Sequence, residues 1–83
     1  MEDTLRYLLT NIVDNPDAIR IDMQSSERRN VLVVHAHKDD MGKIIGKQGR
    51  TIRAIRDIIK IMAARERTYV DVELAEEESN EEV

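Results

Sequence analysis

The residues best suited to chemistry lie in one short stretch, Gly42–Arg56. It holds all three glycines of the 83-residue chain, and five basic residues with no acidic one. Within it, Gly46–Gly49 separates two apolar helical patterns, which predicts a tight turn between two short helices. The first turn of a helix has unpaired N–H groups and a partial positive charge, and glycine lets a ligand approach the backbone. With Lys47, Arg50 and Arg53 around it, this turn is suited to bind phosphate groups.

A nucleotide-binding P-loop does not fit this stretch. Its pattern needs a glycine five residues before Gly46, where Met41 stands, and Ser or Thr after Lys47, where Gln48 stands. The repeated cations instead predict a ligand that carries several phosphates in a row.

The turn and its flanks resemble the signature of a KH domain, an RNA-binding module. The string from Ile44 to Ile52 has two apolar residues, a Gly-x-x-Gly loop and an apolar residue three positions beyond it. In KH domains this loop clamps about four backbone nucleotides. The resemblance therefore implies binding of single-stranded RNA, with the bases in an apolar groove. The residues that it assigns to RNA binding are Lys43, Ile44, Ile45, Gly46, Lys47, Gln48, Gly49, Arg50, Ile52 and Arg53.

The net charge of −4 is unevenly distributed along the chain. Residues 43–67 hold eight basic and two acidic side chains, a net charge of +6, whereas the remainder holds five basic and fifteen acidic ones, a net charge of −10. Because the local charge decides attraction to a polyanion, the acidic total does not exclude RNA. The aromatic residues, Tyr7 and Tyr69, are too few for base stacking to be the main source of affinity.

Length and composition exclude several other classes of protein. Eighty-three residues form one domain without room for a catalytic cavity, and no nucleophile–base or carboxylate pair is recognisable, so we expect neither enzyme activity nor a cofactor. The absence of cysteine rules out disulfides and thiolate metal sites. No apolar run approaches the ~20 residues of a membrane span, and the N-terminus lacks a signal-peptide pattern. We expect a soluble, cytoplasmic protein without membrane contact.

A metal site is suggested by His35 and His37, which precede Asp39 and Asp40. The sequence fixes no third ligand, however, and either aspartate can cap the helix expected at Met41–Ile45. We therefore expect no metal and interpret the histidines as exposed strand residues.

Hydrophobic periodicity predicts the elements that position the turn. Amphipathic helices are expected over residues 3–14, ended by Pro16, and from about Arg50 to Arg65. Alternation predicts strands over residues 18–24, 31–37 and 69–74, with Ile19, Ile21 and Met23 on one face of the first, half-buried strand.

The order of these elements predicts the fold class. A short loop between the first two strands favours an antiparallel hairpin, and the helix pair before the third strand favours a parallel crossover. The result is an α+β fold, a three-stranded mixed sheet with helices on one face, in the order α-β-β-α-α-β. Over residues 1–75 this order resembles the type II KH arrangement, and residues 76–83 remain as an acidic tail that we expect to be disordered.

A single KH domain of this size is similar to the small KhpA-like RNA-binding proteins of bacteria. That resemblance implies a post-transcriptional regulator or RNA chaperone, which forms a homodimer or pairs with a larger KH-containing protein. The alternative is a protein–protein interaction or dimerisation module that uses the KH fold as a scaffold. Its candidate surface is the helix-free face of the sheet, with Val33, His35 and Tyr69.

Overall fold

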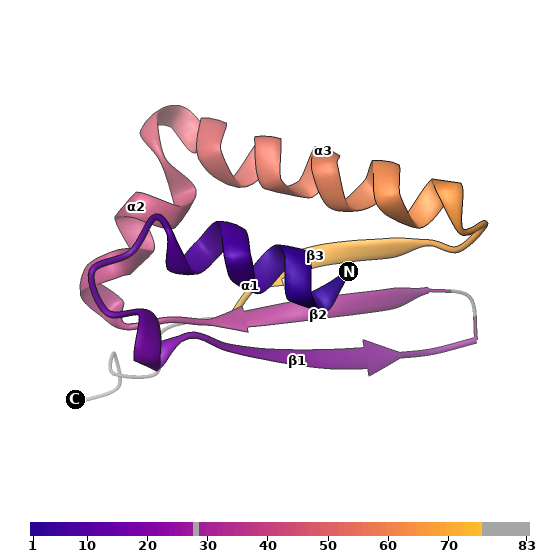
Figure 1. The fold of residues 1–83 in the computed structure, drawn as a ribbon, viewed down its shortest axis with the longest axis horizontal. Coiled ribbons are helices and arrows are strands. Elements are labelled where there is room, and N and C mark those ends of the chain that lie inside the picture. The colour runs from indigo at the N-terminus through magenta and orange to yellow at the C-terminus, as the bar shows by residue number, and fades with distance from the viewer. Residues whose placement is uncertain (28, 76–83) are drawn as a thin grey trace.

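The three-stranded sheet is covered by helices on one face only (Figure 1). The computed structural model describes residues 1–27 and 29–75. In the sheet, β1 (Arg20–Ser25) pairs antiparallel with β2 (Asn30–His35), and β3 (Val70–Leu74) pairs parallel with β2. The predicted α+β fold and mixed sheet are confirmed. The tail predicted over residues 76–83 lies outside the described residues.

Three α-helices and three short 3-10 turns complete the described chain. The helices are α1 (Glu2–Thr10), α2 (Met41–Ile45) and α3 (Arg50–Arg65), and the last two have the predicted bounds. The 3-10 turns are η1 (Pro16–Ala18), η2 (Lys38–Asp40) and η3 (Lys47–Gly49). Ala18 lies in η1 and His37 caps η2, so β1 starts two residues later, and β2 ends two residues earlier, than predicted.

Helix α1 ends four residues before its predicted end. The Thr10 hydroxyl donates to the carbonyl of Arg6 at 2.8 Å, and the Asn11 amide donates to that of Tyr7 at 2.8 Å. The N–H groups of Ile12 and Val13 both donate to the Leu9 carbonyl, at 3.0 and 3.2 Å. Side-chain hydrogen bonds to carbonyls of the last turns thus accompany the end of the helix at Thr10, six residues before Pro16.

The hydrophobic core lies between the sheet and the helices. Its fully buried apolar side chains come from α1, α2, α3, β2 and β3, and they are Leu5, Leu9, Leu32, Val34, Ile44, Ile59 and Val72. Ile19 and Ile21, which were predicted to share one face of the first strand with Met23, are buried, whereas Met23 is exposed. It stands near the hairpin end of β1, where Gln24 and Ser25 are exposed as well.

Candidate nucleic-acid interface

The turn between α2 and α3 is built on three residues with positive φ. Gly46 ends α2 at φ 78° and ψ 172°, and Gln48 and Gly49 follow at φ 55° and 77°. The Gly46 N–H donates to the Gly42 carbonyl at 2.9 Å, and the Gly49 N–H donates to the Gly46 carbonyl at 3.0 Å. The backbone itself therefore closes the turn and starts α3 at Arg50.

The two glycines of the turn are needed for different reasons. A Cβ on Gly46 would lie 2.6 Å from Cβ and 2.8 Å from the backbone nitrogen of Thr51, so no side chain fits there. At Gly49 the nearest atom to such a Cβ is Nη2 of Arg53, at 4.0 Å. Gly49 is thus required only by its left-handed backbone, at a cost to other residues of about 1–2 kcal/mol.

Two backbone amides of the turn are available to a ligand. The N–H groups of Lys47 and Gln48 open η3, and neither has an acceptor among the residues that the structure describes. The sixteen-residue helix α3 begins immediately afterwards, and its first turn carries a partial positive charge. Gln48 holds a left-handed conformation that is strained for a residue other than glycine. This geometry favours an anion over the turn.

Three of the four predicted basic residues stand free around these amides. Lys47, Arg50 and Arg53 are exposed, and none forms an ion pair with an acid within residues 1–27 and 29–75. Lys43 differs, because its Nζ lies 3.3 Å from Oδ2 of Asp14. Phosphate binding at Lys43 must therefore compete with a carboxylate that is already in place.

The three isoleucines predicted to line an apolar groove differ in their exposure. Ile44 is 0% exposed and Ile52 is 7% exposed, so both belong to the core under the turn. Ile45, at 39% exposed, is the one that presents apolar surface to the solvent. A base near the turn would touch Ile45 directly, while Ile44 and Ile52 support the surface from below.

Asp40, which the sequence predicted as a possible side-chain cap of α2, is buried and binds the loop after α1. Asp40 is 1% exposed, and its oxygens accept bonds from the N–H of Asp14 at 3.1 Å, the N–H of Asn15 at 2.9 Å and the side-chain amide of Asn15 at 3.1 Å. Neither Asp39 nor Asp40 makes the predicted side-chain cap of α2. Instead, Asp40 stands directly before α2, and its side chain binds Asp14 and Asn15 in the loop after α1.

The environment of Asp40 keeps its carboxyl ionised. Burial alone would raise the pKa, but the hydrogen bonds from the Asp14 backbone and from the Asn15 side chain and backbone, together with the charge of Lys43, lower it below its ordinary value. The sequence carries no local signal for this role, since the partners lie 25 and 26 residues away. The one indication is that the sequence has two adjacent aspartates, Asp39 and Asp40, where a helix cap needs one.

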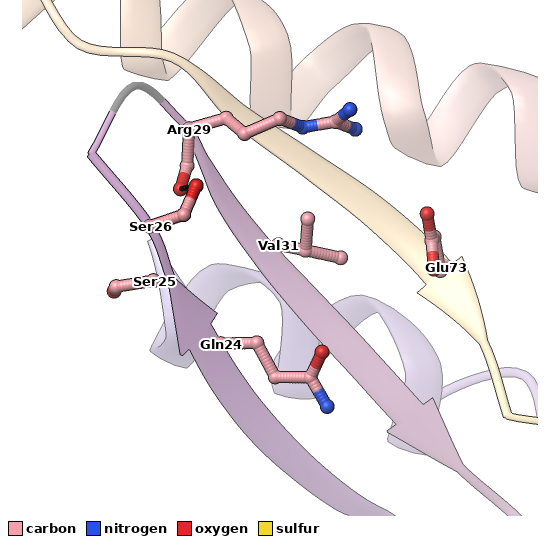
Figure 2. Close-up of a pocket in the computed structure, with 6 residues that line it drawn as sticks. All are labelled: Gln24, Ser25, Ser26, Arg29, Val31 and Glu73. Atoms are coloured by element: carbon pink, nitrogen blue, oxygen red, sulfur yellow. Dashed lines mark hydrogen bonds between the residues drawn. The ribbon is translucent and has the colours of Figure 1, made fainter.

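The helix-free face of the sheet presents paired charges. Figure 2 shows a pocket of about 360 Å³ at its hairpin end, lined by Gln24, Ser25, Ser26, Arg29, Val31 and Glu73. Arg29 pairs with Asp71 at 3.3 Å and lies 5.8 Å from the ring centre of Tyr69. The pocket wall thus carries both signs of charge and lacks the free cations of the turn.

The predicted histidine positions do not converge on a metal site. Nε2 of His35 lies 3.0 Å from Oδ2 of Asp22, which also pairs with Arg20 at 3.4 Å, whereas Nδ1 of His37 accepts from the N–H of Asp39 at 3.0 Å. Within the described chain, no group of three or more histidine, aspartate or glutamate side chains is placed to hold a metal ion. Among the same residues, no helix has the length and apolar character to cross a membrane.

Comparison with known proteins identifies the family. A family model described as the KH domain of KhpA and KhpB matches residues 2–74. The chain belongs to this KH family. Three relatives are each named RNA-binding protein KhpA, and they come from Mycobacterium tuberculosis, Streptomyces coelicolor and Chlamydia pneumoniae. Their identities are 43% over 63 residues (76% of this chain, 79% of the relative), 42% over 65 residues (78% and 82%) and 39% over 77 residues (93% and 99%), respectively.

Part of a solved structure shares the fold of this chain. Part of Aquifex aeolicus Era, in its crystal structure bound to GDP.AlF4-, superimposes with a TM-score of 0.61 at 16% sequence identity. The match covers 84% of this chain and 27% of the Era chain, so this KH domain spans about a quarter of that protein's length. At such low identity the likeness concerns the fold alone. The family model, by contrast, spans residues 2–74, which include the turn, Asp40 and β3.

Proposed function

We propose that this KH domain binds single-stranded RNA at Gly46–Gly49 and acts without catalysis, as a cytoplasmic post-transcriptional regulator or RNA chaperone. The observation that carries the proposal is the pair of amides at Lys47 and Gln48, which lack an acceptor in the described chain and lie among three unpaired cations. The name shared by the relatives, RNA-binding protein KhpA, supports the same class of ligand.

The RNA backbone is held by the turn. A phosphate over the turn accepts hydrogen bonds from the two free amides, and the missing side chain at Gly46 lets it come close to the backbone. Lys47, Arg50 and Arg53 neutralise this phosphate and its neighbours. Lys43 joins them only where the RNA displaces Asp14 from its ammonium group.

The bases are held by apolar and polar contacts beside the turn. Ile45 offers exposed aliphatic surface, over a floor formed by Ile44 and Ile52. Contacts of this kind need bases that are unpaired, because a duplex hides their faces in the stack. The domain therefore prefers single-stranded RNA to duplex RNA, with modest affinity for one domain.

The decisive test places negative charge where the phosphate should lie. Lys47 and Gln48 are both exposed, so the K47D/Q48D double variant should keep its fold, with a change in the free energy of unfolding of roughly 1 kcal/mol or less. Its affinity for a fluorescein-labelled unstructured RNA, measured by anisotropy, should fall below detection. Circular dichroism and thermal unfolding verify the fold.

A variant with the same change in charge controls for a general effect. Lys38 and Ser25 are exposed and lie outside the turn, and K38D/S25D changes the net charge by the same amount as K47D/Q48D, one positive charge lost and two negative charges gained. This control should retain most of the affinity. Unchanged RNA binding by folded K47D/Q48D would exclude the turn as the site, and equal losses in both variants would assign the effect to net charge.

We also propose that the protein forms a homodimer, or pairs with a larger KH-containing protein, through a surface outside the turn. Ile58 and Ile61 favour α3 as that surface, because they are 41% and 63% exposed and lie three positions apart on one helix. The helix-free sheet face predicted from the sequence, with Val33, His35 and Tyr69, is the second candidate for a protein–protein interaction module.

Analytical ultracentrifugation distinguishes these two surfaces. The wild type should sediment at twice its chain mass of 9.6 kDa at micromolar concentration, and so should K47D/Q48D. I61E should be monomeric if α3 forms the interface, and V33E if the sheet face does. A species of 9.6 kDa alone, even at high concentration, would contradict pairing with a second copy.

A further inference from the structure

The negative net charge of the chain comes from one short segment. The acidic tail, residues 76–83, contains five glutamates and no basic residue, and it lies outside the described residues. The remainder of the chain holds thirteen basic residues and twelve of the seventeen acidic ones, a net charge of +1. The sequence thus gathers its excess of carboxylates directly after β3.

The acidic tail follows the sheet at the end of the fold that carries the turn. The N–H of Ala75 donates to the carbonyl of Val34 at 2.9 Å, which fixes the last described residue beside the end of β2. Strands β2 and β3 run opposite to α3, so both strands end where α3 begins (Figure 1). The tail therefore starts on the side of the proposed RNA site and away from the hairpin.

One hydrogen bond relates the position of Ala75 to that of the turn. Nε of Arg56 donates to the carbonyl of Val72 at 2.9 Å, which brings α3 and β3 into contact there. Arg50 lies six residues before Arg56, about 9 Å along the helix axis. Ala75 lies three residues beyond Val72, about 10 Å along the strand and toward the same end of the fold. Arg50 and Ala75 are thus roughly level, separated by the spacing of helix and sheet.

The acidic tail is long enough to reach the turn. An extended chain spans at most about 3.3–3.6 Å per residue, so eight residues reach roughly 26–29 Å from Ala75. Glu76 and Glu77 can lie at most about 7 Å from Ala75, whereas Glu81 and Glu82 can lie about 20–25 Å away. The distal pair of glutamates is therefore the pair that can meet the cations of the turn.

The turn offers a carboxylate the same partners as a phosphate. Lys47, Arg50 and Arg53 are exposed and form no ion pair within the described chain, and the N–H groups of Lys47 and Gln48 have no acceptor there. Carboxylates accept charge-assisted hydrogen bonds from guanidinium, ammonium and backbone N–H groups. Because the tail is joined to the domain, it meets the turn at an effective concentration in the millimolar range.

We propose that the acidic tail occupies the turn in the absence of RNA, and that RNA must displace Glu81 and Glu82 from it. The proposal rests on RNA binding at the turn and adds a regulation of that site, since carboxylates and phosphates compete for the same cations and amides. Surface ion pairs of this kind are weak and are screened by salt. The tail therefore weakens RNA binding without abolishing it, and its effect is largest at low salt.

A spin label tests for the tail at the turn without any RNA. The chain has no cysteine, so Ser79→Cys provides a single site for a nitroxide. In amide NMR spectra at about 0.05 M salt, the label should broaden the signals of Lys47, Gln48 and Arg50, and much less so at about 0.5 M. Adding E81Q/E82Q to the labelled protein should remove most of the broadening at low salt. Broadening that salt does not change, or that is no stronger at the turn than at exposed Lys38, would overturn the proposal.

RNA affinity is compared between two double variants with the same change in net charge. E81Q/E82Q removes the two carboxylates that reach the turn, and E76Q/E77Q removes two that stay beside the sheet. At about 0.05 M salt, the affinity for a fluorescein-labelled unstructured RNA should rise roughly threefold to tenfold in E81Q/E82Q, and less than twofold in E76Q/E77Q. Near 0.5 M salt, both variants should bind as the wild type does.

The outcomes separate this proposal from RNA binding at the turn. Equal gains in the two double variants would assign the effect to net charge, and no gain in either would mean that the tail does not compete with RNA. Either result overturns the proposal and leaves the RNA site intact. Failure of the RNA site itself would appear as unchanged binding in K47D/Q48D. The label spectra, which contain no RNA, would then still show whether the tail occupies the turn.

Discussion

At the turn end of the molecule, Lys47, Arg50 and Arg53 stand exposed without an acid beside them in the described chain, whereas at the hairpin end Arg29 is paired with Asp71 and lies over Tyr69. Figure 1 places the turn and the β1–β2 hairpin at opposite ends of the fold. Both ends carry arginine on the surface. The residues compared differ in charge pairing: the protein already neutralises the charge of Arg29, but not those of Lys47, Arg50 and Arg53 within the described chain.

This difference matters more than the number of charges. A cation that is paired within the protein must give up its carboxylate before it binds a phosphate, so it contributes little to the affinity for RNA. An unpaired cation loses no carboxylate when it binds a phosphate, so the whole free energy of that contact adds to the affinity for RNA. The same reasoning explains how a chain with a net charge of −4 can present a positive surface.

The largest expected effect comes from closing the turn end sterically. Gly46→Ala places a Cβ against Thr51 and forces an alanine into a backbone region almost restricted to glycine. The strain and the overlap together should destabilise the domain by about 3 kcal/mol or more, and RNA binding should be lost. Urea unfolding followed by circular dichroism measures the first effect, and anisotropy the second.

Gly49→Ala is the matched control for this change. Its Cβ would meet only Nη2 of Arg53, at an ordinary contact distance of 4.0 Å, and would introduce left-handed strain, so we expect a loss of about 1–2 kcal/mol and an intact turn. RNA should still bind under conditions where the variant is folded. Equal destabilisation by both substitutions would show that overlap with Thr51 is not the limiting factor at Gly46.

The second prediction compares one arginine from each end. For single strands, the slope of log affinity against log salt is about −0.7 per neutralised phosphate, so two to four contacts give roughly −1.5 to −3. Arg53→Ala should weaken binding and make the slope shallower by about 0.7, whereas Arg29→Ala should leave it unchanged. Anisotropy titrations at several salt concentrations measure both variants.

Two results of the salt titration would break the contrast between the ends. A shallower slope for Arg29→Ala would mean that RNA reaches the hairpin end despite the ion pair with Asp71. A flat response in the wild type would mean that phosphates are not held by the cations of the turn at all. Equal affinity for duplex and single-stranded RNA would contradict the need for unpaired bases.

The sequence alone predicts most of the fold, because periodicity and turn chemistry act locally. Apolar spacing sets α2 and α3 at their observed bounds, and the connection lengths set the directions of the strands. The early end of α1 was not predictable from Pro16, since the side chains of Thr10 and Asn11 close the helix first. The exposure of Met23 depends on how far the helices cover β1, and the alternation of apolar and polar residues along the strand does not predict that.

The site is predicted less completely, because its energetics depend on contacts between distant residues. The sequence places Lys47, Arg50 and Arg53 correctly around a turn, but it treats Lys43 as equal to them. It also does not distinguish Ile44 and Ile52, which are buried, from Ile45, which is exposed. The anchoring of Arg56 on Val72 joins residues 16 positions apart across the crossover, and no local pattern reports such a pair.

The third prediction concerns acid, and it isolates the carboxylate behind the turn. The unfolded Asp40 carboxyl takes up a proton near pH 3.9, while the folded one has a lower pKa. Its contribution to stability is therefore fully present above about pH 5, and is lost as the pH falls below 3.9 through the folded pKa. The difference in unfolding free energy between wild type and D40N should shrink over that range.

The other carboxylates are shared by both proteins, so the difference between them reports on Asp40. Urea unfolding at intervals from pH 6 to pH 3 provides the values. A difference that stays constant to pH 3 would contradict a lowered pKa, and one that grows in acid would mean that Asp40 is protonated in the folded state. The hairpin end carries no buried carboxylate among the described residues, and it offers no comparable effect.

The smallest expected effect comes from freeing Lys43, which would make the turn end still less like the hairpin end. The Asp14 carboxylate is 76% exposed and its ion pair with Lys43 is on the surface, so Asp14→Asn should change the stability by less than about 0.5 kcal/mol. RNA affinity should rise roughly twofold to fivefold, because Lys43 no longer exchanges a partner. The salt slope should steepen by up to about 0.7.

Asp17→Asn is the matched control, since Asp17 is exposed in the same loop and forms no ion pair within the described chain. An equal gain in Asp17→Asn would assign the effect to net charge and would return Lys43 to the same class as Lys47.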